Sequence, residues 1–141
     1  MPAMDLPREA RRAALSTLKA NADLIAIVPA ARIYSQRVPT APVWPFIKFG
    51  PVQGLPIKAA CTRGSVISFS VHAFAKALAN ETAEDYAGRI GAHVKAALDG
   101  SRATFTGGTV RYTVAEEQLL IDGAEADAMH YFAVVSARVI A

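Results

Sequence analysis

Hydrophobic and polar residues alternate along the stretch from Ser65 to Phe74. Ile67, Phe69 and Val71 are separated by polar residues, which is the period of two expected of a strand with one buried face. A segment with helical spacing follows after a short polar link. A strand that leads into a helix in this way is typical of α/β and α+β domains, and the rest of the predicted fold is arranged around it.

Two segments show the pattern of amphipathic helices. The first extends from Asp5 to Ala20, with Asp5 suited to cap the helix and Pro7 tolerated in its first turn. The second extends from about Glu81 to Leu98 and carries an apolar residue at every fourth position. These positions are Tyr86, Ile90, Val94 and Leu98. We therefore expect two helices packed on one face of a sheet.

Other short apolar or alternating segments predict the remaining strands. They are residues 32–34, 46–52, 104–106, 109–115 with a continuation at 119–121, and 129–140. The adjacent residues Glu116 and Glu117 favour a β-bulge in the fourth of these segments. The sequence predicts an α+β fold in one domain over residues 1–141, with a mainly antiparallel four- to five-stranded sheet.

The stretch from Gln53 to Gly64 is interrupted by glycine and proline, and we expect a long polar connection there. It carries Lys58 and Arg63. Both are candidate residues of a loop that faces a partner or DNA, and solvated surface charge is the alternative interpretation.

Gly88 and Gly91 lie inside the second predicted helix, where each costs roughly 1 kcal/mol relative to alanine. They leave one side of the helix smooth, which suits the close approach of another backbone. Packing within the chain and contact with a second subunit both explain this pattern. Both glycines are therefore candidate subunit-interface residues.

The segment from Met129 to Ile140 is largely apolar on both sides. This pattern is typical of a strand covered on both faces, yet two helices cover only one face of a small sheet. A neighbouring subunit is the expected cover of the second face, where Phe132 and Val134 are candidate interface residues. The alternative is that residues 21–45 fold back over this face.

Composition narrows the function classes. The chain has 141 residues, a net charge of +3 and a pI of about 9.2. This small positive charge is scattered along the chain, so it is weak support for nucleic-acid binding. Proteins that bind nucleic acids usually carry a basic stripe. Cys61 is the only cysteine, so no internal disulfide can form. No apolar run approaches the roughly 20 residues that span a bilayer, so we expect no membrane partner.

Residues with catalytic or metal-binding chemistry form no recognisable motif. His72, His93 and His130 lie on three separate predicted elements and lack the spacing of metal ligands. Cys61 lies close to Arg63 in the sequence, but no base that could activate it is identifiable. We therefore predict that the protein is not an enzyme and has no cofactor, metal or small-molecule substrate.

Residues 32–74 resemble a known family. The resemblance rests on Arg32-Ile33-Tyr34, Val38-Pro39, the run from Pro45 to Gly50, and Ser65 to Phe74 with its Val-His-Ala-Phe ending. Taken in this order, with a helix before and after, they resemble the tail-completion proteins, or tail terminators, of long-tailed bacteriophages and gene transfer agents. The order of the motifs carries the resemblance more than any one motif.

The resemblance implies a structural virion protein. Subunits of the family form a ring of six on the end of the tail tube, stop its polymerisation and provide a surface for head–tail joining. The implied partners are further copies of the chain, the tail tube protein, neck or connector proteins, and DNA that passes through the lumen without specific binding. The implied location is the tail end at the neck of a virion assembled in the bacterial host cytoplasm.

Three other interpretations stay open. Another neck or head-completion connector protein would differ in its position in the particle. A small nucleic-acid-binding protein is favoured only by the pI, and it predicts salt-sensitive DNA affinity of the free subunit. A small cytoplasmic enzyme would require a polar pocket of converging groups, which the sequence does not indicate.

Overall fold

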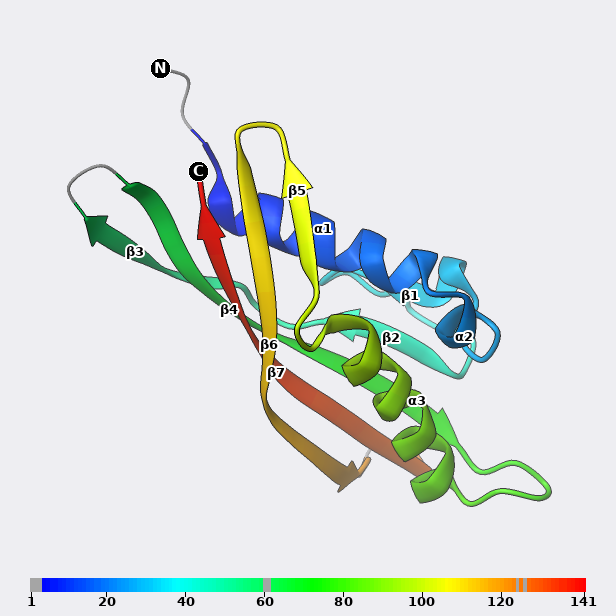
Figure 1. The fold of residues 1–141 in the computed structure, drawn as a ribbon. Helices are drawn as coiled ribbons and strands as arrows, with labels where there is room; N and C mark the ends of the chain where they lie inside the picture. The colour runs from blue at the N-terminus through cyan, green and yellow to red at the C-terminus, as the bar shows by residue number, and fades with distance from the viewer. Residues whose placement is uncertain (1–3, 60–61, 124, 126) are drawn as a thin grey trace.

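The structure is a computed structural model, and it describes residues 4–59, 62–123, 125 and 127–141. Two long helices lie against an elongated, twisted sheet (Figure 1). In chain order the elements are α1 (Leu6–Ala20), α2 (Ala22–Ile25), a 3₁₀ turn (Ala30–Arg32), β1 (Ile33–Tyr34), β2 (Phe46–Phe49), β3 (Gln53–Ala59), β4 (Thr62–Lys76), α3 (Ala83–Leu98), β5 (Arg102–Phe105), β6 (Gly108–Ile121) and β7 (Ala128–Ile140).

The sheet is built around the pairing of β4 with β7, which runs antiparallel from Gly64–Ile140 to Lys76–Ala128. The strand order is β1-β2-β4-β7-β6-β5, and β3 pairs with the part of β4 that β2 leaves free. β1 runs parallel to β2, and the other pairs are antiparallel. The prediction of a mainly antiparallel sheet is confirmed, but the sheet has seven strands instead of four to five.

The prediction of a long connection at residues 53–64 is wrong. β3 and the first part of β4 form a hairpin, with Gln53 opposite Ser68 and Ala59 opposite Thr62. Pro56 indicated a loop, but an edge strand tolerates proline because one side of its backbone is not needed for the ladder. We call this hairpin, residues 53–59 and 62–65, the arm.

Both predicted helices form, and a side chain caps the first turn of each. The Asp5 side chain accepts a hydrogen bond from the backbone N–H of Arg8 at 3.0 Å. Thr82 accepts one from the backbone N–H of Asp85 at 3.1 Å. Asn21 ends α1 and caps the short helix α2. These side chains satisfy backbone donors that a helix leaves without partners at its start.

The predicted bulge lies in β6. The register shifts between Val114, which lies opposite Val135, and Glu116, which lies opposite Val134. Ala115 is therefore an extra residue without its own partner in the ladder. β6 bends in its second half (Figure 1), as expected because a bulge increases local bending and twist.

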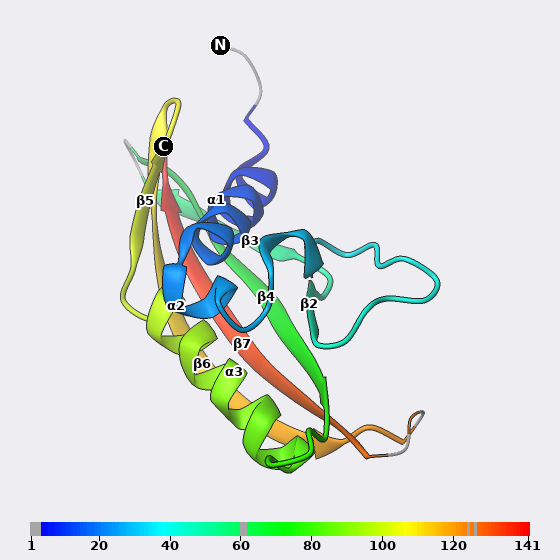
Figure 2. The same ribbon diagram turned by 90° about the vertical axis from the view of Figure 1, so that its right-hand side faces the viewer.

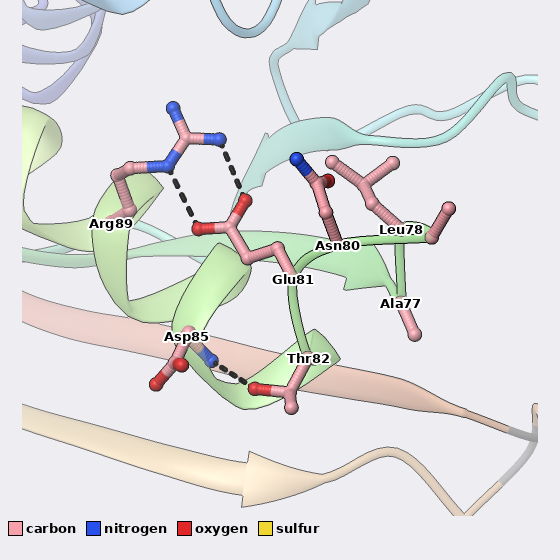
Figure 3. Close-up of a pocket in the computed structure, with 8 residues that line it drawn as sticks. Ala77, Leu78, Asn80, Glu81, Thr82, Asp85 and Arg89 are labelled. Atoms are coloured by element: carbon pink, nitrogen blue, oxygen red, sulfur yellow. Dashed lines mark hydrogen bonds and ion pairs between the residues drawn. The ribbon is translucent and has the colours of Figure 1, made fainter.

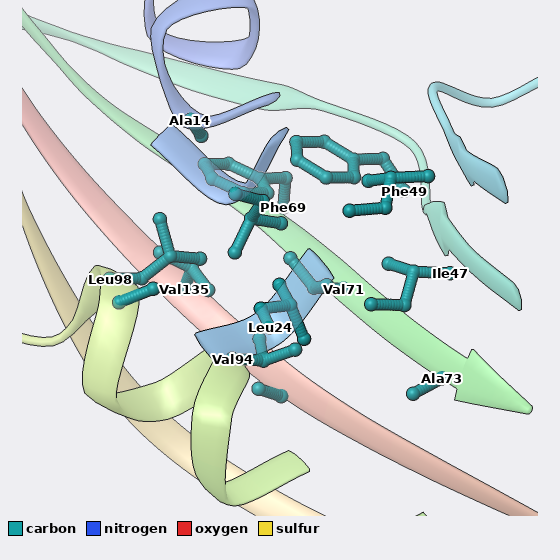
Figure 4. Packing of buried hydrophobic residues seen from close by; sticks show 14 of the residues in the cluster. Ala14, Leu24, Ile47, Phe49, Phe69, Val71, Ala73, Val94, Leu98 and Val135 are labelled. Atoms are coloured by element: carbon teal, nitrogen blue, oxygen red, sulfur yellow. The ribbon is translucent and has the colours of Figure 1, made fainter. Parts of the chain in front are cut away.

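Buried residues from the helices and from one face of the sheet form one core (Figure 4). Leu24 of α2 and Val94 and Leu98 of α3 lie among its fully buried side chains, and Phe69 and Val71 of β4 meet them from the sheet. The apolar stripe predicted for the second helix is thus the face of α3 that turns to the sheet.

A buried tyrosine links α1 to strand β6. Tyr112 on β6 is fully buried, and its hydroxyl donates a hydrogen bond to the carbonyl oxygen of Ala10 at 2.6 Å. Burial raises the pKa of Tyr112, so the hydroxyl keeps its proton and remains a donor at physiological pH. Its ring also meets that of Phe69 edge-on, at a centroid distance of 6.3 Å.

The two glycines of α3 have different surroundings. Gly91 is buried, and a methyl group added there would collide with the ring of Tyr131 on β7. Gly91 therefore permits packing within the chain, because the backbone of α3 contacts the Tyr131 ring at this position. A methyl group added at Gly88 would meet no atom within 4 Å.

We expect Gly91→Ala to lower the free energy of unfolding by about 1–3 kcal/mol, as overpacking of a buried contact does. Gly88→Ala is the matched control, because it adds the same group to the same helix in open space. It should raise the free energy of unfolding by up to about 1 kcal/mol. Chemical denaturation followed by circular dichroism measures both, and equal effects of the two changes would contradict the Gly91–Tyr131 contact.

Candidate interaction surface on the open sheet face

The sheet has one face under the helices and one face turned away from them, which we call the open face. Side chains alternate between the two faces along a strand, so the open face holds the residues that alternate with the core residues of β4 and β7. These are Ser70, His72 and Phe74 on β4, and His130, Phe132 and Val134 on β7. All of them are half-buried, whereas their neighbours under the helices are buried. The helices lie on the opposite side (Figure 2).

Aromatic rings form a row across the open face. Phe74 stacks on Phe46 of β2 at a centroid distance of 4.8 Å and on the imidazole of His130 at 4.3 Å. His72 stacks on Phe132 at 5.6 Å. Aromatic contacts of this kind contribute about 0.5–1.5 kcal/mol each beyond the area they bury, so the row is a preformed apolar surface. We call these five residues the aromatic row.

The margin of the aromatic row at β2 carries a tryptophan and two lysines. Trp44 meets Phe46 edge-on at 5.2 Å and Phe74 at 6.1 Å. The ammonium group of Lys76 lies 4.7 Å from the centre of the Trp44 ring, and that of Lys48 lies 5.8 Å from the centre of the Phe74 ring. These contacts hold positive charge over aromatic faces and give the row a cationic border.

Residues 21–45 contribute little to the open face. α2 belongs to the helical layer, where Leu24 lies in the core. Val43 is 59% exposed. Trp44 reaches the margin of the aromatic row through the contacts described above. The alternative that residues 21–45 cover the second face therefore holds for Trp44 alone. The rest of the segment forms no layer over this face.

Two histidines meet in the middle of the row. Nδ1 of His72 lies 2.7 Å from Nε2 of His130, and Nε2 of His72 lies 2.7 Å from the hydroxyl oxygen of Ser70. With both rings neutral, the two hydrogen bonds can form in either direction along this chain. If both rings were protonated, two N–H groups would face each other and the bond between the rings would be lost.

Burial, the charge of His130 and the charge of Lys48 lower the pKa of His72 from 6.5 to about 4, with burial the largest cause. Burial also lowers the pKa of His130. Both rings are therefore neutral at neutral pH. The open face is thus an uncharged aromatic surface at its centre, with Lys48 and Lys76 on its margin, and Lys76 is also paired with Glu125 at 3.4 Å.

The chemistry of this surface suits packing against a partner. Within the described part of the chain, no group of three or more His, Cys, Asp or Glu residues is arranged to hold a metal ion. Among the same residues, every buried side-chain nitrogen or oxygen atom has a hydrogen-bond partner. The histidines therefore serve as polar members of an otherwise apolar row.

A second feature is an open hollow between the end of β4 and the start of α3 (Figure 3). Glu81 and Arg89 form a two-bond ion pair across it, with distances of 3.0 and 2.9 Å. The pairing with Arg89 lowers the pKa of Glu81. Thr82 and Asp85 on the same wall are engaged in the helix cap. The ion pair and the helix cap thus stabilise the turn into α3.

The residues predicted as sites fall in separate places. Phe132 and Val134 lie side by side on the open face, opposite His72 and Ser70 of β4. Lys58 and Arg63 lie opposite each other on the two strands of the arm. Gly88 lies in a surface hollow beside α3, with Lys95 and Glu117 among its neighbours. Cys61 lies outside the described residues.

Sequence reasoning missed the aromatic row and the histidine pair. His72 and His130 are separated by 58 positions, and they meet only because β4 and β7 pair in one register. The available signal was that each histidine lies two positions before a phenylalanine in a strand-like segment, Phe74 in one case and Phe132 in the other. His93, the third histidine, lies on α3 and takes no part in the pair.

We expect the free energy of unfolding to fall as the pH is lowered from about 6.5 to about 4. The pKa of His72 is lower in the folded state than in the unfolded state, so protons bind preferentially to the unfolded chain in this range. His72→Phe keeps an aromatic ring and should make the pH dependence shallower. Urea denaturation at several pH values measures the slope, and His93→Phe is the control. An unchanged slope in His72→Phe would contradict this assignment.

Comparison with known proteins identifies the family. A model of the family described as tail completion protein gp17 matches residues 12–140. No curated protein sequence gives a significant match. A chain in the solved structure titled "Virion of native gene transfer agent (GTA) particle" superposes with a TM-score of 0.79 over 98% of this chain and 100% of that chain, at 22% identity. At this identity the likeness shows a shared fold.

The described part of the chain has no helix with the length and apolar character needed to cross a membrane. The family match extends over nearly the whole sequence and includes α3, β7 and the two strands that pair with β7, which are β4 and β6. The resemblance of residues 32–74 to phage tail-completion proteins is confirmed. The chain belongs to the family of tail completion protein gp17.

Proposed function

We propose that the protein is a tail terminator, a structural virion protein that forms a ring of six subunits on the end of the tail tube. The ring stops tube polymerisation and provides the surface for head–tail joining, while DNA passes through its lumen without specific binding. The proposal treats residues 1–141 as a single tail-terminator domain. The observation that carries it is the match of residues 12–140 to a family described by tail completion, which is a structural role and not a catalytic one.

The open face supports this proposal because it is an apolar surface suited to a protein partner. Phe132 and Val134 are half-buried in the isolated subunit, and Phe132 belongs to the aromatic row. Exposed apolar surface of this kind usually marks an interaction site. In the proposed ring these two residues contact another protein of the particle, and a neighbouring subunit is the preferred partner.

Two other elements are proposed to face partners. Gly88 lies on the outer side of α3, where its missing side chain leaves room for the close approach of a neighbouring chain. The arm extends from the end of the sheet with Lys58 and Arg63 on facing strands (Figure 1). Its possible partners in the particle are the tail tube, the DNA and a neighbouring subunit.

The first test is electron microscopy of particles from a producing strain that lacks this gene. We expect overlong or irregular tails beside filled heads that have not joined them. Tails of normal length with unjoined heads would instead indicate another neck or head-completion protein. Complete, normal particles would refute the structural role in the tail.

A second test examines the open face by complementation of the deletion strain. Phe132→Asp and Val134→Asp each place a carboxylate where a partner would have to bury it, which costs several kcal/mol at an interface. We expect both variants to remain folded by circular dichroism and to lose the production of joined particles. Phe132→Leu keeps the apolar character and is the matched control. Full complementation by folded aspartate variants would show that this face is not an assembly surface.

A further inference from the structure

Two exposed apolar segments lie at diagonally opposite corners of the sheet. One is the arm, where Leu55 is 72% exposed. The other is the outer half of β6, where Leu119, Leu120 and Ile121 are 37%, 42% and 82% exposed. We call residues 115–123, 125 and 127 the β6 tail, of which residues 115–121 belong to β6. These two segments hold four of the six exposed large hydrophobic side chains found among the described residues.

The backbone of each segment lies at an edge of the sheet. β3 pairs with the first half of β4, and in the described part of the chain no other strand pairs with it. On the other side, β5 pairs with β6 only between Gly108 and Arg111. The β6 tail is therefore bordered by β7 on one side only. An unpaired edge can pair with another chain, and proteins protect such edges, for example by covering them with another segment.

The two segments carry opposite charge. Residues 53–64 contain Lys58 and Arg63 and no acidic residue. Residues 115–127 contain five acidic residues and no lysine or arginine. Two of the five, Glu117 and Glu125, are paired within the chain with lysines of α3 and β4, and both pairs are exposed to solvent. By sequence the β6 tail is therefore acidic and the arm is basic, and Asp122 of the β6 tail also has an interaction within the chain.

We infer that the arm of one subunit docks on the β6 tail of the next subunit. The inference rests on the proposed ring and names the contact that builds it. Apolar residues would form the centre of the contact, with Leu55 against Ile121, and opposite charges would border it. The occupant is a second copy of this chain because one molecule carries both complementary surfaces.

The contact is heterologous, since the arm and the β6 tail are different surfaces of the same molecule. Contacts of this type join subunits head to tail, and they close into a ring when the rotation between subunits fits. The two surfaces lie at opposite corners of the molecule in Figure 1, so one subunit can bind two neighbours at once. Pro56 lies in β3 and lacks an N–H group, which favours docking through side chains over a continuous backbone ladder.

The test is cross-linking inside purified particles. In a Cys61→Ser background, Leu55→Cys and Ile121→Cys are combined in one chain, and the deletion strain is complemented with it. A short bismaleimide joins cysteines that lie close together, and denaturing gels then resolve the products. We expect a ladder of multimers from the double variant and monomers from each single variant. Val43→Cys combined with Ile121→Cys is the matched control, because Val43 is also exposed but lies outside the arm.

Monomers alone from complete particles of the double variant would overturn the inference and leave the tail-terminator proposal standing. Dimers from a single variant would show a symmetric contact and would also overturn it. The tail-terminator proposal fails separately, if deletion of the gene leaves particles normal.

If the cysteine variant does not assemble, a charge exchange tests the contact between the arm and the β6 tail. Lys58→Glu with Arg63→Glu should abolish joined particles, and adding Glu116→Lys with Glu125→Lys should restore them. Restoration supports the contact between the arm and the β6 tail. Loss without restoration would assign the cations of the arm to the tail tube or to DNA, and unchanged assembly after the first exchange would show that they bind no partner.

Discussion

The pairing of β4 with β7 is the interaction on which the rest of the structure depends. The two strands run side by side from Gly64–Ile140 to Lys76–Ala128, and they divide their side chains between the core and the open face. A shift of the pairing by one residue would turn every side chain of a strand to the other face. The core under α3 and the stacking of His72 on Phe132 therefore require the same register. One backbone ladder thus fixes both surfaces of the sheet.

One face of this sheet forms the core, and the other face is not covered by the helices. The face under the helices supplies the buried core, closed at one end by the Tyr112 hydroxyl bound to Ala10 and in the middle by Gly91 against Tyr131. Because this core is complete within one chain, the subunit can fold while its other face stays apolar and uncovered. The half-buried members of the aromatic row are then available to a partner without any rearrangement of the core. The residues that stabilise the fold are thus separate from the residues that are available for contact with a partner.

Features encoded locally were predictable from the sequence, and features that depend on pairing between distant strands were not. The cap at Asp5 and the apolar stripe of α3 require only neighbouring residues, and both are present. The arm was missed because an edge strand buries little, so residues 53–59 need no alternating pattern and tolerate Pro56. The meeting of His72 with His130 depends on the register between β4 and β7, which no local pattern records. The open face was expected from the two-sided apolar pattern of the last strand, and a neighbouring subunit as its cover stays a prediction.

The bulge at Ala115 has a geometric consequence for symmetry. Deletion of Ala115 would keep Val114 opposite Val135 and Glu116 opposite Val134. The same side chains of β6 would therefore face the helices. What the bulge changes is the direction of the strand beyond it. If the arm and the β6 tail join successive subunits, the angle between these two surfaces sets how many copies close a circle. A single inserted residue in one strand would then determine the diameter of the ring, and its deletion would produce a polymer of different rotational order from an otherwise unaltered subunit.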